Sequence, residues 1–349
     1  MTRTHDVALV RGDGIGPEIS EATQRVLEAA GASIRWHDAP AGADGMARKG
    51  HELPISTIQT IRRFGVALKA PLTAGRCTGG VVVEDNGASR RHPSVNNGIR
   101  RELGLFVNVR PVHGWKDLSG EYAALDIVIM REITEDIYSG IERKIDDNTA
   151  EAVKRITRPA CERVARYSCE FAGRHGRREV SAIHKANVLH LTDGLFLETV
   201  RNVSTGYPGL HFSETAVDAA CYLLVKKPRH FDVMVMPNQY GDILSDLAAA
   251  LVGSLGLAPG ANIGADAAVF EAAHGAAPDI AGQGIANPIG LILAGAMLLD
   301  HIGEPEAAAR VRAAVDAALA DRRLWTPDLG GSARTLELTE ALCGAAEVA

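Results

Sequence analysis

Short apolar runs alternate along the chain with longer stretches in which apolar residues recur every three or four positions. The runs have the length and composition of buried strands, predicted at 7–10, 33–36, 66–68, 106–110, 127–130, 180–183 and 233–235. Helical spacing begins at Pro17 and ends near Gly31. Strands alternating with helices in this way are typical of an α/β fold with a largely parallel sheet.

Three further segments have patterns of their own. Residues 75–93 are rich in Gly, Ser and Arg and are predicted to form a loop or hairpin, in which 81–83 could be a short strand. Residues 138–180 are predicted to hold a long amphipathic helix at 148–173, flanked by segments that could be strands. The apolar run 289–299 is shorter than the roughly 20 residues that a membrane helix needs, and is predicted to be a buried helix.

Size and charge narrow the classes of protein. The 349 residues suffice for two lobes with separate cores. A formal net charge of −6 argues against a general nucleic-acid binder, which usually carries a basic face. Neither a CxxC pair nor a signal-like N-terminus is present, which favours reduced thiols at Cys77, Cys161, Cys169, Cys221 and Cys343. We therefore expect a soluble cytoplasmic protein with no nucleic-acid or membrane partner.

The glycine-rich segment 12–17 follows a strand and opens a helix, as a dinucleotide-binding turn would. Its spacing is GxGxG rather than GxGxxG, and Pro17 lacks a backbone donor. We therefore predict a tight structural turn, with any dinucleotide bound elsewhere.

A polar and basic set is predicted to gather at strand and helix ends. Ser94, Asn96 and Arg100 fall within two turns at the start of a helix, where free backbone donors favour anions. Arg110 lies on a predicted strand, and Arg131 closes another. Three converging arginines suit a substrate with several carboxylates, because guanidinium groups bind carboxylates through paired hydrogen bonds. Surface ion pairs are the alternative for any one of them.

Three aspartates form a candidate metal site. Asp242 and Asp246 are four residues apart and face one side of a predicted helix, while Asp218 lies upstream. Without a counterion the two charges would repel, and a hard cation such as Mg²⁺ or Mn²⁺ would relieve this. Two solvated aspartates are the alternative.

Lys185 and Tyr138 are candidates for proton transfer. Lys185 lies just after a predicted strand, where an acidic, arginine-rich site could tune its pKa, and Tyr138 could be the paired acid. Further along, His274 lies in a loop of small residues, where a planar ring could approach the backbone. For each of the three, a purely structural role stays open.

Taken together, these segments resemble the β-decarboxylating family of isocitrate, isopropylmalate and homoisocitrate dehydrogenases, from about Val7 to Gly331. The resemblance rests on GDGIGPE (12–18), SxNxxxR (94–100), LFVNVRP (105–111), MREITEDIYSGIE (130–142), HKAN (184–187), NQYGDILSD (238–246), APGANIG (258–264), EAAHGAAPDIAG (271–282) and ANP (286–288). It implies a two-lobed isopropylmalate/isocitrate dehydrogenase-like α/β fold that is not a Rossmann fold. It also implies a large cofactor-binding domain (1–105 and 253–349) and a small domain (106–252) that carries the dimer interface.

The resemblance also assigns roles to residues. Arg100, Arg110 and Arg131 would hold the substrate carboxylates, and Tyr138 and Lys185 would be the acid/base pair. The chain would be an obligate homodimer that interlocks through a clasp at about 138–180, with Lys185 and Asn187 reaching the neighbouring subunit's site. Asp242 and Asp246 of one subunit and Asp218 of the other would bind Mg²⁺ or Mn²⁺.

Within the family, enzymes that act on isocitrate have Ser and Asn at the positions of Ser94 and Asn96. Enzymes that act on isopropylmalate have apolar residues there, and those that act on homoisocitrate tend to have an arginine. Asp279 and Ile280 resemble the NAD form, where NADP enzymes usually have Lys-Tyr. The resemblance therefore implies NAD-linked oxidative decarboxylation of isocitrate. The cofactor would lie against Thr73, Glu271, His274, Gly275, Ala277, Asp279, Ile280 and Asn287.

The chain departs from the family pattern in two places. At Lys69–Ala74, members of the family usually have the sequence KGPLTTP. Residues 75–93 replace a shorter loop of the family and end in Arg90-Arg91-His92-Pro93. This stretch is interpreted either as a surface insertion or as added positive charge for another acid, such as homoisocitrate or a phosphonate analogue of isocitrate. A non-catalytic regulatory subunit is the alternative of another class. Such subunits lose part of the lysine, tyrosine and aspartate set, all of which is present here.

Overall fold

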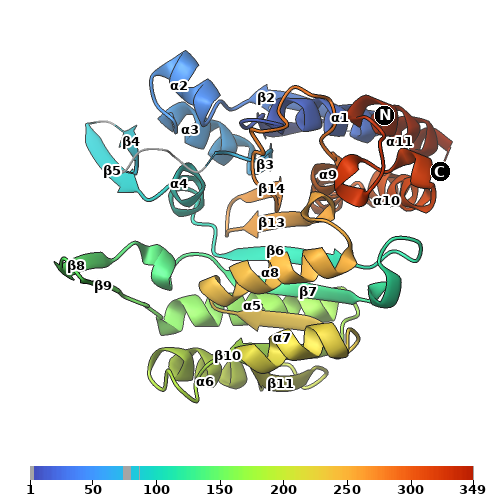
Figure 1. Ribbon diagram of the computed structural model, residues 1–349. Coiled ribbons are helices and arrows are strands. Elements are labelled where there is room, and N and C mark those ends of the chain that lie inside the picture. Colours follow the sequence, from blue (N-terminus) through green and yellow to red (C-terminus); the bar gives the residue numbers. More distant parts are fainter. Residues whose placement is uncertain (1–3, 74–79, 86, 349) are drawn as a thin grey trace. The chain divides into compact units, whose positions relative to one another are not determined.

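The computed structural model describes residues 4–73, 80–85 and 87–348, which fall into two compact units. Unit 1 comprises Met1–Gly104, Trp115–Leu118 and Gly253–Ala349, and unit 2 comprises Leu105–Gly114 and Ser119–Val252 (Figure 1). Cys77 and residues 74–79 lie outside the described part of the chain.

Unit 1 is built on strands in the order β2-β1-β3-β14-β13. Neighbours pair in parallel except β13 and β14, which are antiparallel. These strands are β1 (His5–Val10), β2 (Ile34–Asp38), β3 (Val66–Lys69), β13 (Pro259–Ile263) and β14 (Ala268–Ala272). All residues of β3 and β14 are buried, as their near-continuous apolar sequences require.

Helices complete the core of unit 1. They are α1 (Gly16–Ala29), α2 (Ala43–Lys49), α3 (Ile55–Phe64), α4 (Val95–Glu102), α9 (Ile289–His301), α10 (Pro305–Ala320) and α11 (Thr335–Val348). The predicted buried helix at 289–299 is confirmed as α9, which is apolar on nearly every face and packs between β13–β14 and helices α1 and α10. Its Gly295 lets Leu27 of α1 approach within van der Waals distance.

The predicted hairpin in residues 75–93 is confirmed for its described part. Strands β4 (Val81–Asp85) and β5 (Ala88–His92) pair antiparallel and lie beside α4 (Figure 1). Gly98 of α4 permits this contact, because a β-carbon there would lie 2.5 Å from a methyl carbon of Leu53 and 3.4 Å from the ring of His92.

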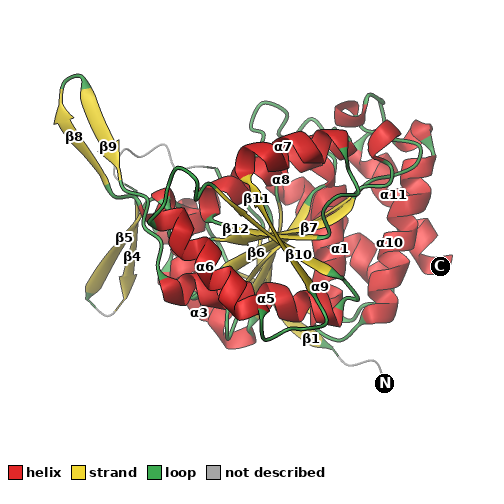
Figure 2. Ribbon diagram, turned by 90° about the horizontal axis from the view of Figure 1, so that it is seen from below, coloured by secondary structure: helices red, strands yellow, loops and turns green. Residues whose placement is uncertain are grey.

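Unit 2 contains strands in the order β11-β10-β12-β7-β6, parallel except for β6 and β7. They are β6 (Val107–His113), β7 (Asp126–Glu132), β10 (Glu179–His184), β11 (His211–Ala216) and β12 (Val233–Met236). Helices α5 (Arg158–Arg174) and α6 (Thr192–Ser204) lie on one side of these strands, and α7 (Val217–Lys226) and α8 (Asn238–Val252) on the other (Figure 2). This mixed architecture confirms the predicted α/β class.

The prediction of one long helix at 148–173 is wrong at its N-terminal end. Helix α5 begins at Arg158, and Pro159 occupies its first turn, where a missing backbone donor costs nothing. Upstream, β8 (Glu142–Asp146) and β9 (Thr149–Ala152) form an exposed antiparallel hairpin. That this hairpin is a dimer clasp stays a prediction.

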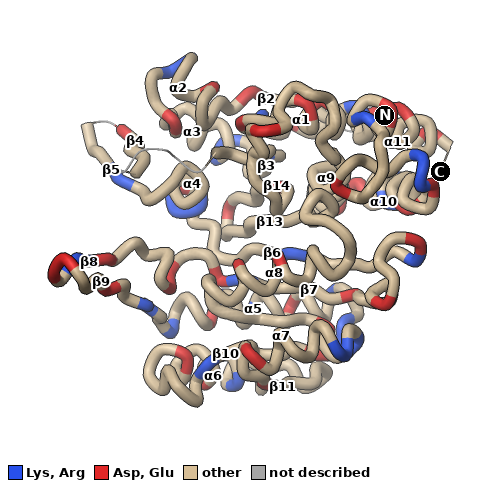
Figure 3. Tube along the Cα trace, in the orientation of Figure 1, with Lys and Arg blue, Asp and Glu red and all other residues tan. Residues whose placement is uncertain are grey.

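Acidic and basic residues are interspersed along the elements of each unit (Figure 3). Among the described residues, no helix combines the length and apolarity needed to cross a membrane.

Candidate functional site

The glycine-rich turn after β1 is structural, as predicted. A β-carbon on Gly12 would lie 2.3 Å from the carbonyl oxygen of Pro71, and one on Gly14 would lie 2.0 Å from that of Ala276. The Asp13 carboxylate accepts backbone hydrogen bonds from Ala43 and Thr73, both at 2.8 Å. The turn therefore supports neighbouring loops through close backbone contacts.

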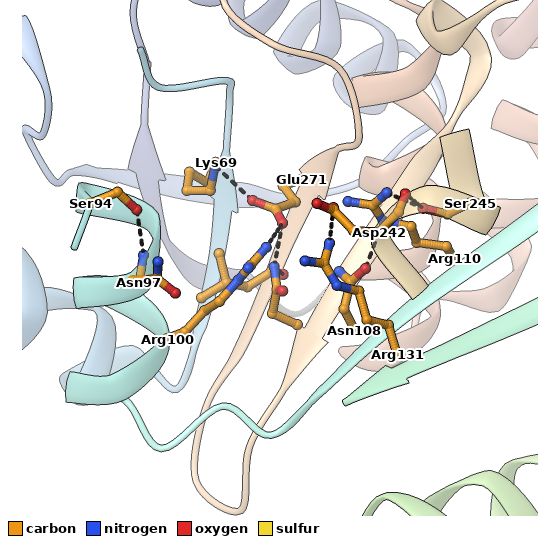
Figure 4. Close-up of polar contacts among 12 residues, drawn as sticks. Lys69, Ser94, Asn97, Arg100, Asn108, Arg110, Arg131, Asp242, Ser245 and Glu271 are labelled. Carbon is orange, nitrogen blue, oxygen red and sulfur yellow. Dashed lines mark hydrogen bonds and ion pairs between the residues drawn. The ribbon is translucent and has the colours of Figure 1, made fainter. Parts of the chain in front are cut away.

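In unit 2, Arg110 and Arg131 are buried and anchored by neighbouring side chains (Figure 4). The Nε of Arg110 donates to Oδ1 of Asn108 at 2.7 Å, and its Nη1 donates to Ser245 of α8. Arg131 donates from Nε and Nη2 to Oδ1 of Asn238, at 2.9 and 2.7 Å. Both guanidinium planes are therefore fixed by the protein, as specific carboxylate recognition requires.

The two aspartates of α8 are paired with these arginines. Asp242 accepts hydrogen bonds from Arg131 and from the Tyr138 hydroxyl, and Asp246 lies 3.2 Å from Nη1 of Arg110. The arginines therefore supply positive charge beside these carboxylates, and a bound Mg²⁺ or Mn²⁺ at Asp242 and Asp246 stays a prediction. Burial raises the pKa of Asp246, and the neighbouring Asp242 raises it further against the opposing effect of Arg110.

Tyr138 lies in the 3₁₀ turn Ile137–Ser139, and the guanidinium of Arg131 lies 5.3 Å from its ring centroid. Burial and the hydrogen bond to Asp242 raise the pKa of Tyr138 to about 12. The phenol therefore stays protonated at neutral pH, in the form that can donate a proton.

Lys185 and Asp218 are brought together elsewhere in unit 2. The ammonium of Lys185, just after β10, lies 2.6 Å from Asp218 in the first turn of α7, and this contact lowers the pKa of the carboxyl. Asn187 is exposed in the following turn. Among the described residues, no three His, Cys, Asp or Glu side chains are grouped so as to hold a metal ion, so Asp218 does not complete such a group with Asp242 and Asp246 of the same chain.

In unit 1, Ser94 caps α4, and its hydroxyl accepts a hydrogen bond from the backbone N–H of Asn97 at 3.2 Å. Oδ1 of Asn96 is buried and has no hydrogen-bond partner within the described structure. Arg100, one turn later, lies 3.4 Å from the carboxylate of Glu271.

Glu271, predicted to contact a cofactor, is buried in an ion-pair network (Figure 4). One oxygen accepts from Asn262 at 2.7 Å, and the other lies 2.7 Å from the buried ammonium of Lys69. Although burial alone would raise it, Lys69 and Arg100 lower the pKa of Glu271 to about 2. Its carboxylate is thus a fixed negative charge that orients Arg100.

Two of the basic residues of the hairpin β4–β5, Arg90 and His92, contact one carboxylate within unit 1. Arg90 donates two hydrogen bonds to the Glu102 carboxylate, at 2.7 and 2.9 Å, and His92 contacts the same group at 2.9 Å. Glu102 is in the last turn of α4, so these contacts fasten the hairpin to the helix that carries Ser94. This arrangement favours a structural insertion over added charge for a larger acid.

The loop after β14 contains most of the predicted cofactor residues. The Nδ1 of His274 donates a hydrogen bond to the Gly275 carbonyl at 3.0 Å and therefore carries a proton, while the buried Nε2 has no partner among the described residues. Burial lowers the pKa of this imidazole. Ala277 has a positive φ of 38°, which turns the chain there.

The remaining predicted cofactor residues differ in exposure. Thr73 and Asp279 are exposed, and Ile280 is half-buried. Asn287 is buried, where its Oδ1 accepts from Ile289 at the start of α9 and its Nδ2 donates to Asp328 at 3.1 Å. Asn287 therefore connects the first residue of α9 to Asp328, which is a structural role.

Sequence reasoning missed the side chains that anchor Arg110 and Arg131, namely Asn108, Asn238 and Ser245, and it missed Lys69, which pairs with Glu271. Asn238 and Ser245 lie in the NQYGDILSD segment, whose polar residues at helical spacing offered a signal. For Lys69 the only signal was a charged residue ending an apolar strand.

Comparison with known proteins decides the family. The model of the isocitrate/isopropylmalate dehydrogenase family matches residues 6–342. The chain belongs to this family. The predicted resemblance is therefore confirmed, and the protein is an enzyme of a decarboxylating dehydrogenase family.

Relatives with different substrate names are about equally similar. The chain is 44% identical to isocitrate dehydrogenase [NAD] catalytic subunit 5, mitochondrial, of Arabidopsis thaliana, over 96% of this chain and 87% of that protein. It is 43% identical to 3-isopropylmalate dehydrogenase of Archaeoglobus fulgidus, over 95% and 96%. Overall identity alone thus leaves the substrate to be argued from the site.

A solved structure confirms the predicted isocitrate dehydrogenase-like fold. The isocitrate dehydrogenase of Methylococcus capsulatus matches with a TM-score of 0.90 and 42% identity, covering 98% of this chain and 99% of that one.

Proposed function

We propose that the protein oxidises isocitrate with NAD⁺ and decarboxylates it to 2-oxoglutarate and CO₂, with the help of a divalent metal ion. The observation that carries the proposal is the fixed pair Arg110 and Arg131, whose buried guanidinium groups lie beside Tyr138 and the carboxylates of α8. Relatives named as NAD isocitrate dehydrogenases support both the reaction and the cofactor.

The choice of isocitrate rests on α4. Isocitrate carries one more carboxylate than isopropylmalate, and the polar Ser94 and Asn96 offer hydrogen bonds where an apolar substituent would require apolar contacts. A carboxylate only accepts hydrogen bonds, so it would take them from the Nδ2 of Asn96 and the hydroxyl of Ser94, while the unpartnered Oδ1 of Asn96 could accept only from a donor such as a hydroxyl. With Arg90 and His92 engaged by Glu102, we assign isocitrate rather than a longer or phosphonate analogue.

The residues present fit a divalent metal ion. Asp242 and Asp246 present partly exposed carboxylates one helical turn apart, with side-chain exposures of 38% and 53%, and Mg²⁺ and Mn²⁺ prefer such oxygen ligands. When bound, the ion would withdraw electrons from the reacting oxygens of the substrate. Asp218 would complete the ligand set from a second subunit.

The loop 274–280 fits NAD⁺, which accepts the hydride when bound. His274 offers a buried unprotonated Nε2, Gly275 leaves open space beside its Cα, and Asp279 is exposed. A carboxylate at this position accepts from a ribose hydroxyl and repels a 2′-phosphate, so Asp279 favours NAD over NADP. The nucleotide would be bordered by Thr73, Ala277, Ile280 and Asn287. Glu271 would contribute by orienting Arg100.

Protons move through Lys185 and Tyr138. Lys185 relays the proton of the substrate hydroxyl away from the site, and the adjacent Asp218 pairs with its ammonium. After CO₂ leaves, the Tyr138 hydroxyl donates a proton to the carbon that carried it. Arg100, Arg110 and Arg131 hold the carboxylates throughout, and Asn187 assists Lys185.

We also propose a homodimer in which Lys185, Asn187 and Asp218 serve the partner's site. Unit 2 leaves large apolar side chains exposed after β10, on α7 and on α8, including Leu191 at 88%. Such side chains support a buried interface. The cytoplasmic location stays a prediction, since the plant and human relatives are named as mitochondrial.

The test is NADH formation by the purified protein with Mg²⁺ or Mn²⁺ and isocitrate, beside homoisocitrate, isopropylmalate, malate and a phosphonate isocitrate analogue. Fast turnover confined to isocitrate, abolished by EDTA and restored by Mn²⁺, is expected. A folded dimer that binds NAD⁺ but turns over another acid faster would overturn the substrate assignment. A folded protein that turns over none of them would instead favour the regulatory-subunit alternative.

A further inference from the structure

A buried lysine joins the two segments that carry Tyr138 and Lys185. Lys154 follows β9, and its side chain is 13% exposed. Its Nζ lies 3.1 Å from Oδ1 of Asp193 and 3.5 Å from Oδ2 of Asp136, both fully buried carboxylates. It also lies 4.3 Å from the ring centroid of Tyr240, at a cation–π distance.

Asp136 shapes the turn that presents Tyr138. Its Oδ1 accepts from the backbone of Ile137 at 2.8 Å, and its Oδ2 accepts from the backbone of Gln239 at 3.0 Å. Its own backbone N–H donates to the carbonyl of Arg155 at 2.9 Å. Asp136 has a φ of 72°, a left-handed conformation that a non-glycine residue keeps only where surrounding contacts hold it.

Asp193 fixes the chain at Lys185. Its Oδ2 accepts from the backbone N–H of Lys185 at 2.7 Å and from the Tyr240 hydroxyl at 2.9 Å. Its Oδ1 accepts no hydrogen bond within the described structure and faces the ammonium of Lys154. The lysine is thus the countercharge on which this oxygen depends.

We infer that Lys154 is a positioning residue for the proposed reaction, holding the Tyr138 turn and the Lys185 backbone in register through Asp136 and Asp193. Two buried carboxylates share this ammonium, and removing it would leave them repelling each other without solvent. Both segments would then move. Arg110 is anchored separately, by Asn108, whereas the Asn238 that holds Arg131 also donates to the carbonyl of Glu135 beside Asp136. The inference rests on the proposed function for its kinetic part only.

The kinetic test compares Lys154→Met, Lys154→Arg and, as a control, Lys144→Met. Lys144 forms an exposed pair with Asp147 on the same hairpin. We expect Lys154→Met to lower kcat by about 10- to 100-fold, because a small displacement of a reacting group has this effect, while KM for isocitrate changes less than kcat. Lys154→Arg should restore most of kcat, and Lys144→Met should match the wild type. An unchanged kcat in Lys154→Met, or a loss carried by KM, would overturn the inference.

Hydrogen–deuterium exchange separates this inference from the proposed function, since it needs no turnover. In Lys154→Met, residues 136–139 and 185–193 should both exchange faster than in the wild type, and in Lys144→Met neither should. Faster exchange of only one segment contradicts the link. If Lys154→Met does not fold, Asp193→Asn takes its place in the test. This variant keeps an oxygen that accepts from the backbone of Lys185 but removes the negative charge that faces Lys154. A wild-type kcat in Asp193→Asn would equally reject the inference. If the wild type shows no dehydrogenase activity but Lys154→Met still speeds exchange in both segments, only the proposed function is contradicted.

Discussion

Asn238 holds Arg131 through a single atom. Its Oδ1 accepts both Nε and Nη2 of the guanidinium, at 2.9 and 2.7 Å, while its Nδ2 donates to the carbonyl of Glu135 at 3.1 Å. Because Asn238 is buried at the first position of α8, the amide cannot rotate freely. The remaining guanidinium nitrogen, Nη1, is thereby directed at Asp242.

Replacing Asn238 with Ala should therefore weaken substrate binding. Two donors of Arg131 would lose their acceptor, and hydrogen bonds to a charged group contribute about 1.5–3 kcal/mol, so we expect kcat/KM for isocitrate to fall by about 10- to 100-fold. Steady-state kinetics beside Asn202→Ala, an exposed asparagine on α6, would measure this. Equal kinetics in the two variants would contradict the anchoring role.

Glu271 should be needed for stability. Glu271→Gln leaves the buried Lys69 ammonium without its countercharge, and breaking a buried pair from one side costs about 3–5 kcal/mol. The double variant Lys69→Met/Glu271→Gln should recover part of that loss, because the buried ammonium is gone and only the partly exposed Arg100 lacks its carboxylate partner. Urea denaturation of both variants measures the free energies of unfolding, and a loss below about 1 kcal/mol in the single variant would rule out the ion-pair account.

The sequence could predict residues whose chemistry is visible from type and spacing. Arg131 at the end of an apolar strand and Asp242 with Asp246 at helical spacing were identifiable in this way. Their partners were not, because an asparagine such as Asn238 anchors an arginine 107 positions away only once the fold brings them together. For the same reason the pairing of Asp242 with Arg131 could not be predicted from the sequence.

Local rules also failed where a hairpin resembled a helix. Residues 148–157 carry no strong breaker, so the amphipathic pattern of α5 could be extended backwards through them. Strand pairing decides the structure of this segment, because Glu142–Asp146 and Thr149–Ala152 form the antiparallel hairpin β8–β9 and the helix starts only after it. Pro159 did mark the true start, because proline fits the first turn of a helix better than its interior.

The hairpin β4–β5 should affect stability rather than substrate choice. Arg90→Met removes the two hydrogen bonds to Glu102 and leaves that buried carboxylate with His92 and a more distant Arg62. We expect a lower melting temperature, with an unchanged ratio of kcat/KM between isocitrate and homoisocitrate. A change in that ratio of more than about 10-fold, equal to 1.4 kcal/mol, would reinstate the hairpin as a specificity element.

Asp279 should set the choice between NAD and NADP. Asp279→Lys exchanges a group that repels a 2′-phosphate for one that attracts it, and we expect the preference for NAD over NADP to fall by about 10-fold or more. Initial rates with both cofactors measure the ratio. Asp266→Lys, an exposed aspartate elsewhere in unit 1, serves as the charge-matched control, and an equal shift in both variants would show a nonspecific effect of charge.

Glu132 should make stability fall as the pH rises toward neutrality. Burial raises its pKa from 4.5 to about 7, against the opposing hydrogen bonds donated by Thr134 and Glu135. Below pH 4.5 the carboxyl is protonated in both states and costs nothing. Between 4.5 and 7 only the unfolded state ionises freely, so unfolding becomes easier, by about 3 kcal/mol once the pH exceeds 7. Glu132→Gln is neutral at every pH and lacks this loss.

Urea denaturation of the wild type and of Glu132→Gln at pH 5, 6, 7 and 8 separates this effect from the fixed cost of the substitution. The amide keeps one acceptor oxygen and loses the other, so the donors of either Thr134 or Glu135 lose their partner, but that penalty is the same at each pH. The free energy of the wild type relative to the variant should therefore fall from pH 5 to 7 and then level off. Parallel curves would mean that Glu132 ionises in the folded protein as readily as in the unfolded chain.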